Sequence, residues 1–172
     1  MLNKLGITCI FAFSFSNSLL ANELLDNEPL DAANTSNNCW VGAGMRYQVD
    51  PWLLYSIAEQ ESSLNPLAVN HNHNKSRDVG LMQINSLWFP ELEKYGLSER
   101  HLFDPCTNIY IGAWILSKSI QVFGNNWRAV GAYNAGTSKN EQREKLRQKY
   151  AQRVYQRYVR LTAGRVRKSA QP

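Results

Sequence analysis

Glu61 is the side chain in this sequence best placed to act as an acid. Asp50 and Pro51 are typical of a helix N-terminus, and Leu54 and Ile57 then recur at helical spacing, so that Glu61 falls on the same apolar face. Burial, together with the negative end of the helix dipole, raises the pKa of a carboxyl group. A carboxylic acid that stays protonated near neutral pH can protonate a leaving oxygen. We expect Glu61 to be a general acid, and a buried glutamate held by structural hydrogen bonds is the alternative.

Two further segments combine small residues with polar side chains. The segment GLMQIN (residues 80–85) places the amides of Gln83 and Asn85 next to a permissive glycine, and such amides can bind the acetamido and hydroxyl groups of sugars. The segment AYNAG (132–136) places a phenol beside an amide where small neighbours allow close approach. Each segment taken alone is also typical of a capped turn.

Taken together, these three motifs resemble those of the lytic transglycosylase family, whose domain has a goose-type lysozyme-like fold. Glu61-Ser62 ends an apolar helix, and GLMQIN and AYNAG follow in the family's order and spacing, so that the resemblance covers about residues 39–161. The sequences DVGLMQIN, PCTNIYIGAWIL and YAQRVYQRY, with the pair of cysteines, look most like the small specialised members. Those members accompany type III and type IV secretion, conjugation and pilus systems.

The resemblance implies a role for each matched residue. Glu61 would be the single acid and base, and Gln83 and Asn85 would line the sugar cleft as substrate-binding residues. Tyr133 would donate a hydrogen bond to the Glu61 carboxyl group and orient it, and Asn134 would support the same wall. Ser62 would help to fix the turn after the catalytic helix. The family uses no metal and no cofactor.

The resemblance also implies the reaction. A β-1,4 bond between N-acetylmuramic acid and N-acetylglucosamine would be cleaved with the help of the substrate's own acetamido group, leaving a 1,6-anhydromuramic end. A hydrolase of the lysozyme type would instead use a second carboxylate. Asp78 is the candidate for that group, although its charged neighbours Lys75 and Arg77 favour a surface ion pair. Glu59, turned by about 200° from Glu61, is expected to face water.

The remaining patterns predict an all-α or nearly all-α single domain, and the resemblance implies that its fold is lysozyme-like. Asp104-Pro105 predicts a second helix that ends at Gly124, and a third helix is expected within residues 126–135. On a last helix, one apolar stripe is expected, made of Leu146, Tyr150, Val154, Tyr158 and Leu161. No stretch shows sustained period-two alternation, so any strands should be short.

The N-terminus has the layout of a signal peptide. One lysine precedes an apolar run that is shorter than the roughly 20 residues needed to span a bilayer, and Ala21 follows it. We expect residues 1–21 to be removed on export to the periplasm, leaving a mature form without a transmembrane segment. Residues 22–37 should be a flexible lead-in, residues 38–162 the catalytic domain and residues 163–172 a basic tail.

After removal of the leader, Cys39 and Cys106 are the two cysteines that remain. Export would place them in an oxidising compartment, where a disulfide is the simplest interpretation and two separate buried thiols are the alternative. The cysteines and the three histidines lack the paired spacing of a structural zinc site. We therefore expect no metal.

Charge separates the two ends of the chain. The formal net charge is +5, and residues 138–172 carry eleven Lys and Arg against two Glu. Such a segment could bind nucleic acid, but its tyrosines fall on the apolar stripe, and attraction to anionic wall or membrane polymers is the milder explanation. The expected partners are peptidoglycan strands and components of a secretion, conjugation or pilus machine. A non-catalytic wall-binding module remains a further alternative.

Overall fold

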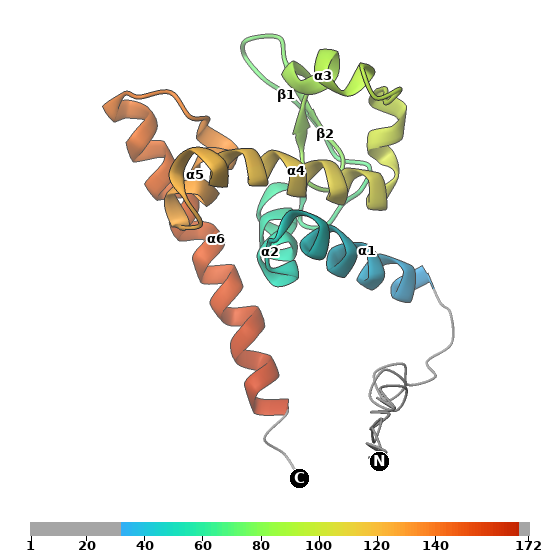
Figure 1. The fold of residues 1–172 in the computed structure, drawn as a ribbon, viewed down its shortest axis with the longest axis vertical. Helices are drawn as coiled ribbons and strands as arrows, with labels where there is room; N and C mark the ends of the chain where they lie inside the picture. The colour runs from blue at the N-terminus through green and yellow to red at the C-terminus, as the bar shows by residue number, and fades with distance from the viewer. Residues whose placement is uncertain (1–31, 169–172) are drawn as a thin grey trace, which may run out of the picture. The chain divides into compact units, whose positions relative to one another are not determined.

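The computed structural model describes residues 32–168, with side-chain environments for residues 38–163, and these residues belong to one compact unit. Helices dominate it, which confirms the prediction of a nearly all-α domain (Figure 1). The elements are α1 (Ala32–Tyr47), α2 (Pro51–Ser62), β1 (Val69–His71), β2 (Arg77–Val79), β3 (Ile84–Asn85), a 3-10 turn (Ser86–Trp88), α3 (Phe89–Glu93), a second 3-10 turn (Glu99–Phe103), α4 (Pro105–Phe123), α5 (Trp127–Ala135) and α6 (Glu141–Lys168).

The helix starts predicted from Asp-Pro pairs are confirmed. The Asp50 carboxylate accepts a hydrogen bond from the Trp52 amide at 2.8 Å, and the Asp104 carboxylate accepts one from the Thr107 amide at 2.7 Å. Asn126 caps α5 in the same way. Each cap satisfies an amide that has no partner within its helix, so the first turns of α2, α4 and α5 are fixed locally.

A small antiparallel sheet, in the order β1-β2-β3, lies beside this helical core (Figure 1). The register pairs Asn70 with Asp78 across β1 and β2, and Asp78 with Asn85 across β2 and β3. Neighbouring residues in such a ladder bring their side chains together on one face. The sheet therefore gathers polar side chains from three segments at its centre.

Helix α4 holds the GLMQIN segment in place through the side chain of Asn108. Asn108 is fully buried; its amide nitrogen donates to the carbonyls of Val79 and Leu102, and its oxygen accepts from the Met82 amide at 2.7 Å. Gly80 has a φ of +80°, and a Cβ there would lie 2.2 Å from the Asn108 amide nitrogen. Only glycine fits this approach, which explains its place in the motif.

Helix α6 packs against α2 and α5, and its buried face follows the predicted stripe except at Leu146. Tyr150 and Val154 are buried as expected, and Tyr158 and Leu161 are half-buried. Leu146 departs from the stripe at 44% exposure, and the neighbouring Arg147 side chain is buried in its place, at 1% exposure. The Arg147 guanidinium donates to the carbonyls of Gly136 and Ser138 in the loop after α5. A buried arginine is stable here because its donors are satisfied, which periodicity alone does not show.

The first and last helices extend beyond the limits expected for the catalytic domain, and the domain bounds themselves stay a prediction. Helix α1 begins at Ala32, so residues 32–37 are helical rather than part of a flexible lead-in, and α6 continues to Lys168 into the predicted basic tail. The predicted signal peptide, residues 1–21, lies outside the described residues. Among those described, no helix is long and apolar enough to cross a membrane.

The disulfide between Cys39 and Cys106 is present and joins α1 to the first turn of α4, as predicted. It closes a loop of 67 residues, and in the chain-entropy model such a link stabilises the fold by about 4 kcal/mol.

We expect a reductant, by breaking this disulfide, to lower the free energy of unfolding measured in urea titrations by about the same amount. A Cys39→Ala/Cys106→Ala protein should show the same loss and no further response to reductant, whereas an unchanged midpoint would contradict the expectation.

Candidate active site

Glu61 occupies the last turn of α2, and its carboxyl group lies among groups from three other elements. Burial raises the pKa of Glu61 from 4.5 to about 7, and the nearby negative charge of Asp78 adds to the increase. The hydrogen bond from Tyr150 and the positive charge of Arg153 act in the opposite direction. Glu61 is therefore partly protonated near neutral pH, as the sequence predicted for a general acid.

The hydrogen-bond partner of Glu61 is Tyr150 rather than Tyr133. The Tyr150 hydroxyl, on α6, donates to Glu61 Oε1 at 2.5 Å, and Arg153 lies 5.7 Å from the centre of the Tyr150 ring. The Tyr133 hydroxyl, on α5, donates instead to the Met82 carbonyl at 2.8 Å. Burial raises the pKa of both phenols, so both act as donors. The hydrogen bond to Glu61 that was expected from Tyr133 thus comes from Tyr150.

Ser62 connects the end of α2 to the GLMQIN segment. Its hydroxyl donates to the Leu81 carbonyl at 2.7 Å and accepts from the Asn65 amide at 3.1 Å. Ser63 and Leu64 then take left-handed conformations, with φ of 53° and 65°. The expectation that Ser62 fixes the turn after the catalytic helix is confirmed, and this turn sets the position of Glu61 relative to the sheet.

The two amides expected in the cleft are both held by the protein. The Gln83 side chain is buried; its nitrogen donates to the Gly80 carbonyl at 2.8 Å and its oxygen accepts from Asn70 at 2.6 Å. The Asn85 nitrogen donates to Asp78 at 2.6 Å, and its oxygen caps the following 3-10 turn. In the described contacts these amides shape the wall of the site, and direct binding of sugar by them stays a prediction.

Asp78 is not part of a surface ion pair with its neighbours. Arg77 forms its ion pair with Glu99, whereas the two Asp78 oxygens accept hydrogen bonds from the amides of Asn85 and Asn72. The expected ion pair is therefore wrong, because strand alternation directs Arg77 and Asp78 to opposite faces. This arrangement holds the Asp78 charge close enough to affect Glu61.

Glu59 and Asn134 complete the set of predicted positions. Glu59 does not simply face water, since its carboxylate accepts from the Arg160 guanidinium at 2.5 Å and lies 3.9 Å from Arg157. Asn134 is exposed on α5, next to Tyr133. Its exposure leaves its amide accessible to a ligand, and substrate binding by Asn134 stays a prediction.

Comparison with known proteins identifies this arrangement. Residues 38–156, more than half of the chain, match the family described as "Transglycosylase SLT domain". The chain belongs to this family. As an SLT-domain protein, it is an enzyme of the peptidoglycan lytic transglycosylase class, and Glu61, Gln83 and Tyr133 all lie within the matched region.

Individual relatives agree with this assignment. "Invasion protein IagB" of Salmonella typhimurium is 45% identical over 125 residues, which cover 72% of this chain and 77% of that protein. "Protein IpgF" of Shigella flexneri is 45% identical over 127 residues, covering 73% and 82%. An inactive mutant of the lytic transglycosylase Slt from Pseudomonas aeruginosa has a TM-score of 0.58 at 24% identity, covering 84% of this chain and 25% of that one, and shows the shared fold.

Tyr150 and Asn108 are the residues of this SLT domain that sequence reasoning missed. Tyr150 was assigned to an apolar stripe, although a buried phenol needs a hydrogen-bond partner that a phenylalanine would not. Asn108 follows Cys106 in an otherwise apolar helix, where a buried amide likewise needs partners. The sequence alone does not show which groups these two side chains would bond. Among the described residues, no group of three or more His, Cys, Asp or Glu side chains is arranged to hold a metal ion.

The hydrogen bond from Tyr150 leads to a prediction for the SLT domain's pH profile. Because this bond lowers the pKa of Glu61, Tyr150→Phe should raise that pKa above about 7. Activity that depends on protonated Glu61 should then persist to higher pH, so that the alkaline limb of kcat/KM moves upward. Tyr133→Phe is the matched control and should leave the limb in place. A limb that moves downward in Tyr150→Phe would contradict the prediction.

Proposed function

We propose that this SLT domain cleaves the β-1,4 bond between N-acetylmuramic acid and N-acetylglucosamine and leaves 1,6-anhydromuramic ends. The observation that carries the proposal is the carboxyl group of Glu61, in the last turn of α2. Its pKa is about 7, and it accepts a hydrogen bond from Tyr150 of α6. Such a group can be protonated at the start of the reaction and ionised later, both near neutral pH.

Glu61 acts twice in the proposed reaction. Its carboxyl group first donates a proton to the glycosidic oxygen, and the substrate's acetamido oxygen closes onto the anomeric carbon as that bond breaks. The Glu61 carboxylate then removes the proton from the primary hydroxyl of the muramic acid, and that oxygen attacks the anomeric carbon and displaces the acetamido oxygen, so that the acetamido group is regenerated and the 1,6-anhydro bridge is formed. Tyr150 orients the carboxyl group through both steps and stabilises its ionised form by donating a hydrogen bond.

Hydrolysis is the second candidate reaction, and the position of the Asp78 carboxylate favours it. Asp78 lies on the strand beside the site, and its charge acts on both Glu61 and Tyr133. A second carboxylate could position a water molecule or stabilise the positive charge of the transition state. We favour the transglycosylase reaction because both Asp78 oxygens already accept hydrogen bonds from side-chain amides. Mass spectrometry of fragments released from purified peptidoglycan distinguishes the two reactions.

The cellular role that we propose is local opening of the wall for a secretion, conjugation or pilus apparatus, after export to the periplasm. One relative of similar length is named an invasion protein, which supports a role beside such a machine. The disulfide supports an oxidising compartment. Cell fractionation tests the location, and recovery of the chain with the cytoplasmic fraction would contradict it.

A further inference from the structure

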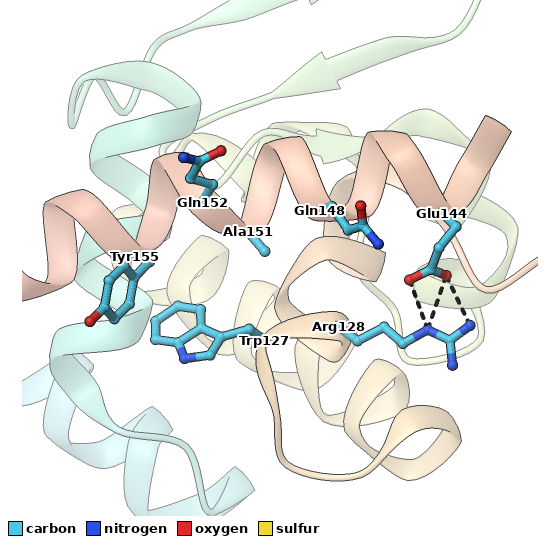
Figure 2. A pocket seen from close by; sticks show the side chains of 7 residues that line it. All are labelled: Trp127, Arg128, Glu144, Gln148, Ala151, Gln152 and Tyr155. Carbon is cyan, nitrogen blue, oxygen red and sulfur yellow. Dashed lines mark hydrogen bonds and ion pairs between the residues drawn. The ribbon is translucent and has the colours of Figure 1, made fainter. Parts of the chain in front are cut away.

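A hollow of about 610 Å³ lies between α5 and α6 (Figure 2), and Glu61 is not among the residues that line it. Its walls come from the first turn of α5 and from a stretch of α6. Seven residues line it: Trp127, Arg128, Glu144, Gln148, Ala151, Gln152 and Tyr155. The volume falls within the range of about 300–1,000 Å³ that is typical of sites for small ligands.

The hollow and the active site lie on different flanks of α6. Tyr150, which contacts Glu61, is turned by about 140–200° around the helix from Gln148, Gln152 and Tyr155. Helix α6 itself therefore stands between the hollow and the catalytic carboxyl group. A ligand in the hollow would not contact Glu61, Asp78 or Tyr133.

Two aromatic rings meet at one end of the hollow. Trp127 and Tyr155 pack edge to face with 5.0 Å between ring centres, and both remain accessible, at 38% and 50% exposure (Figure 2). Trp127 also packs against Tyr158, so its indole is held in place. Exposed but ordered rings offer an apolar surface to the C–H face of a sugar ring at little entropic cost.

Apart from Ala151, polar side chains line the rest of the hollow. Arg128 and Glu144 form a hydrogen-bonded ion pair at the other end, at 2.9–3.1 Å (Figure 2). The same carboxylate also accepts hydrogen bonds from the buried Arg147. The exposed Gln148 side chain lies between this pair and the rings (Figure 2). A primary amide offers a donor and an acceptor, which complement those of an acetamido group.

From this combination we infer a second binding site for N-acetylated sugars of the glycan strand, separate from the catalytic cleft. The two aromatic rings and the amide beside them fit a sugar ring that carries an acetamido group. The site would hold the enzyme on polymeric wall while the cleft acts on the strand. The choice of sugar rests on the proposed function, whereas occupancy of the hollow does not depend on turnover.

The test is NMR titration of the full mature chain with a soluble β-1,4-linked N-acetylglucosamine trimer. The Glu61→Gln variant serves as the host, so that no ligand is consumed. We expect the Trp127 indole and Gln148 amide signals to shift and saturate. Gln148→Ala should weaken binding at this site by about two- to tenfold, the value of one neutral hydrogen bond. Gln156→Ala, an exposed glutamine on α6 outside the hollow, is the matched control and should bind as the host does.

Two outcomes would overturn the inference. One is a Trp127 signal that does not move at millimolar trimer while signals near residue 61 do. The other is a shift at Trp127 with the free stem peptide but not with the sugar. Products of the active enzyme are measured separately, so reducing ends in place of anhydro ends would overturn the proposed reaction and leave this binding result intact.

Discussion

A Glu61→Gln protein is expected to lose at least ~10²- to 10⁴-fold of its wall-degrading activity, the usual contribution of a general acid. The amide keeps the shape of the carboxyl group and can still accept the hydrogen bond from Tyr150 through its oxygen. What it lacks is the proton that the leaving oxygen needs. Turnover of purified peptidoglycan, followed by release of soluble fragments, measures the loss. Full activity in a folded Glu61→Gln protein would contradict the proposed mechanism.

The same substitution should stabilise the fold, which separates lost chemistry from lost structure. Because the folded pKa of Glu61 is raised to about 7, ionised Glu61 opposes folding, and stability falls as the pH rises from about 4.5 through about 7. A pKa shift of this size lowers the free energy of unfolding by about 3 kcal/mol at pH values above 7. Glu61→Gln removes the pH-dependent cost, so the difference in Tm from the parent protein should grow between pH 5 and pH 9.

Glu59→Gln is the matched control on the same helix. Its carboxylate contacts Arg160 and Arg157 of α6 rather than the site, so catalysis should be nearly unchanged. Loss of a partly exposed ion pair should cost at most about 1 kcal/mol of stability. A large loss of activity in this variant would instead show that the α2–α6 contact positions Glu61.

The sequence predicted this fold well where local chemistry determines structure. Asp50 and Asp104 cap helices whatever surrounds them, because each carboxylate bonds an amide two or three residues away. The face of α2 that carries Glu61 follows from helical periodicity alone. The disulfide partners followed from the prediction that the chain is exported, which leaves two cysteines to pair.

Residues that depend on long-range contacts could not be placed in this way. Tyr150 reaches Glu61 across 89 positions of sequence, and the distinction between Tyr150 and Tyr133 depends on the angle at which α6 crosses α2. Arg147, rather than Leu146, lies on the buried face because its guanidinium donates hydrogen bonds to two carbonyls in the loop after α5. The partner of Arg77 is Glu99, in a different element. Each of these contacts depends on tertiary geometry, which the periodicity of the sequence does not determine.

The second large effect concerns the product. We expect the released muramic ends to be mainly of the 1,6-anhydro form, about 18 mass units below hydrolysed ends, because water is not a reactant when the sugar's own hydroxyl attacks. Membership of the SLT family and the single carboxyl group poised near pH 7 support this outcome. Mass spectrometry of the fragments gives the ratio of the two forms directly.

Asp78→Asn then separates an electrostatic role of Asp78 from a chemical one. Removal of its negative charge should lower the pKa of Glu61, and each unit lost costs about tenfold in the protonated fraction at high pH. In the transglycosylase reaction, therefore, the alkaline limb of kcat/KM moves to lower pH, opposite to the shift expected for Tyr150→Phe, while activity in acid stays largely intact and the anhydro product is unchanged. Glu99→Gln, a carboxylate paired with Arg77, should leave the limb in place. Mainly reducing ends that disappear in Asp78→Asn would mean that Asp78 activates water, and the reaction would then be hydrolysis.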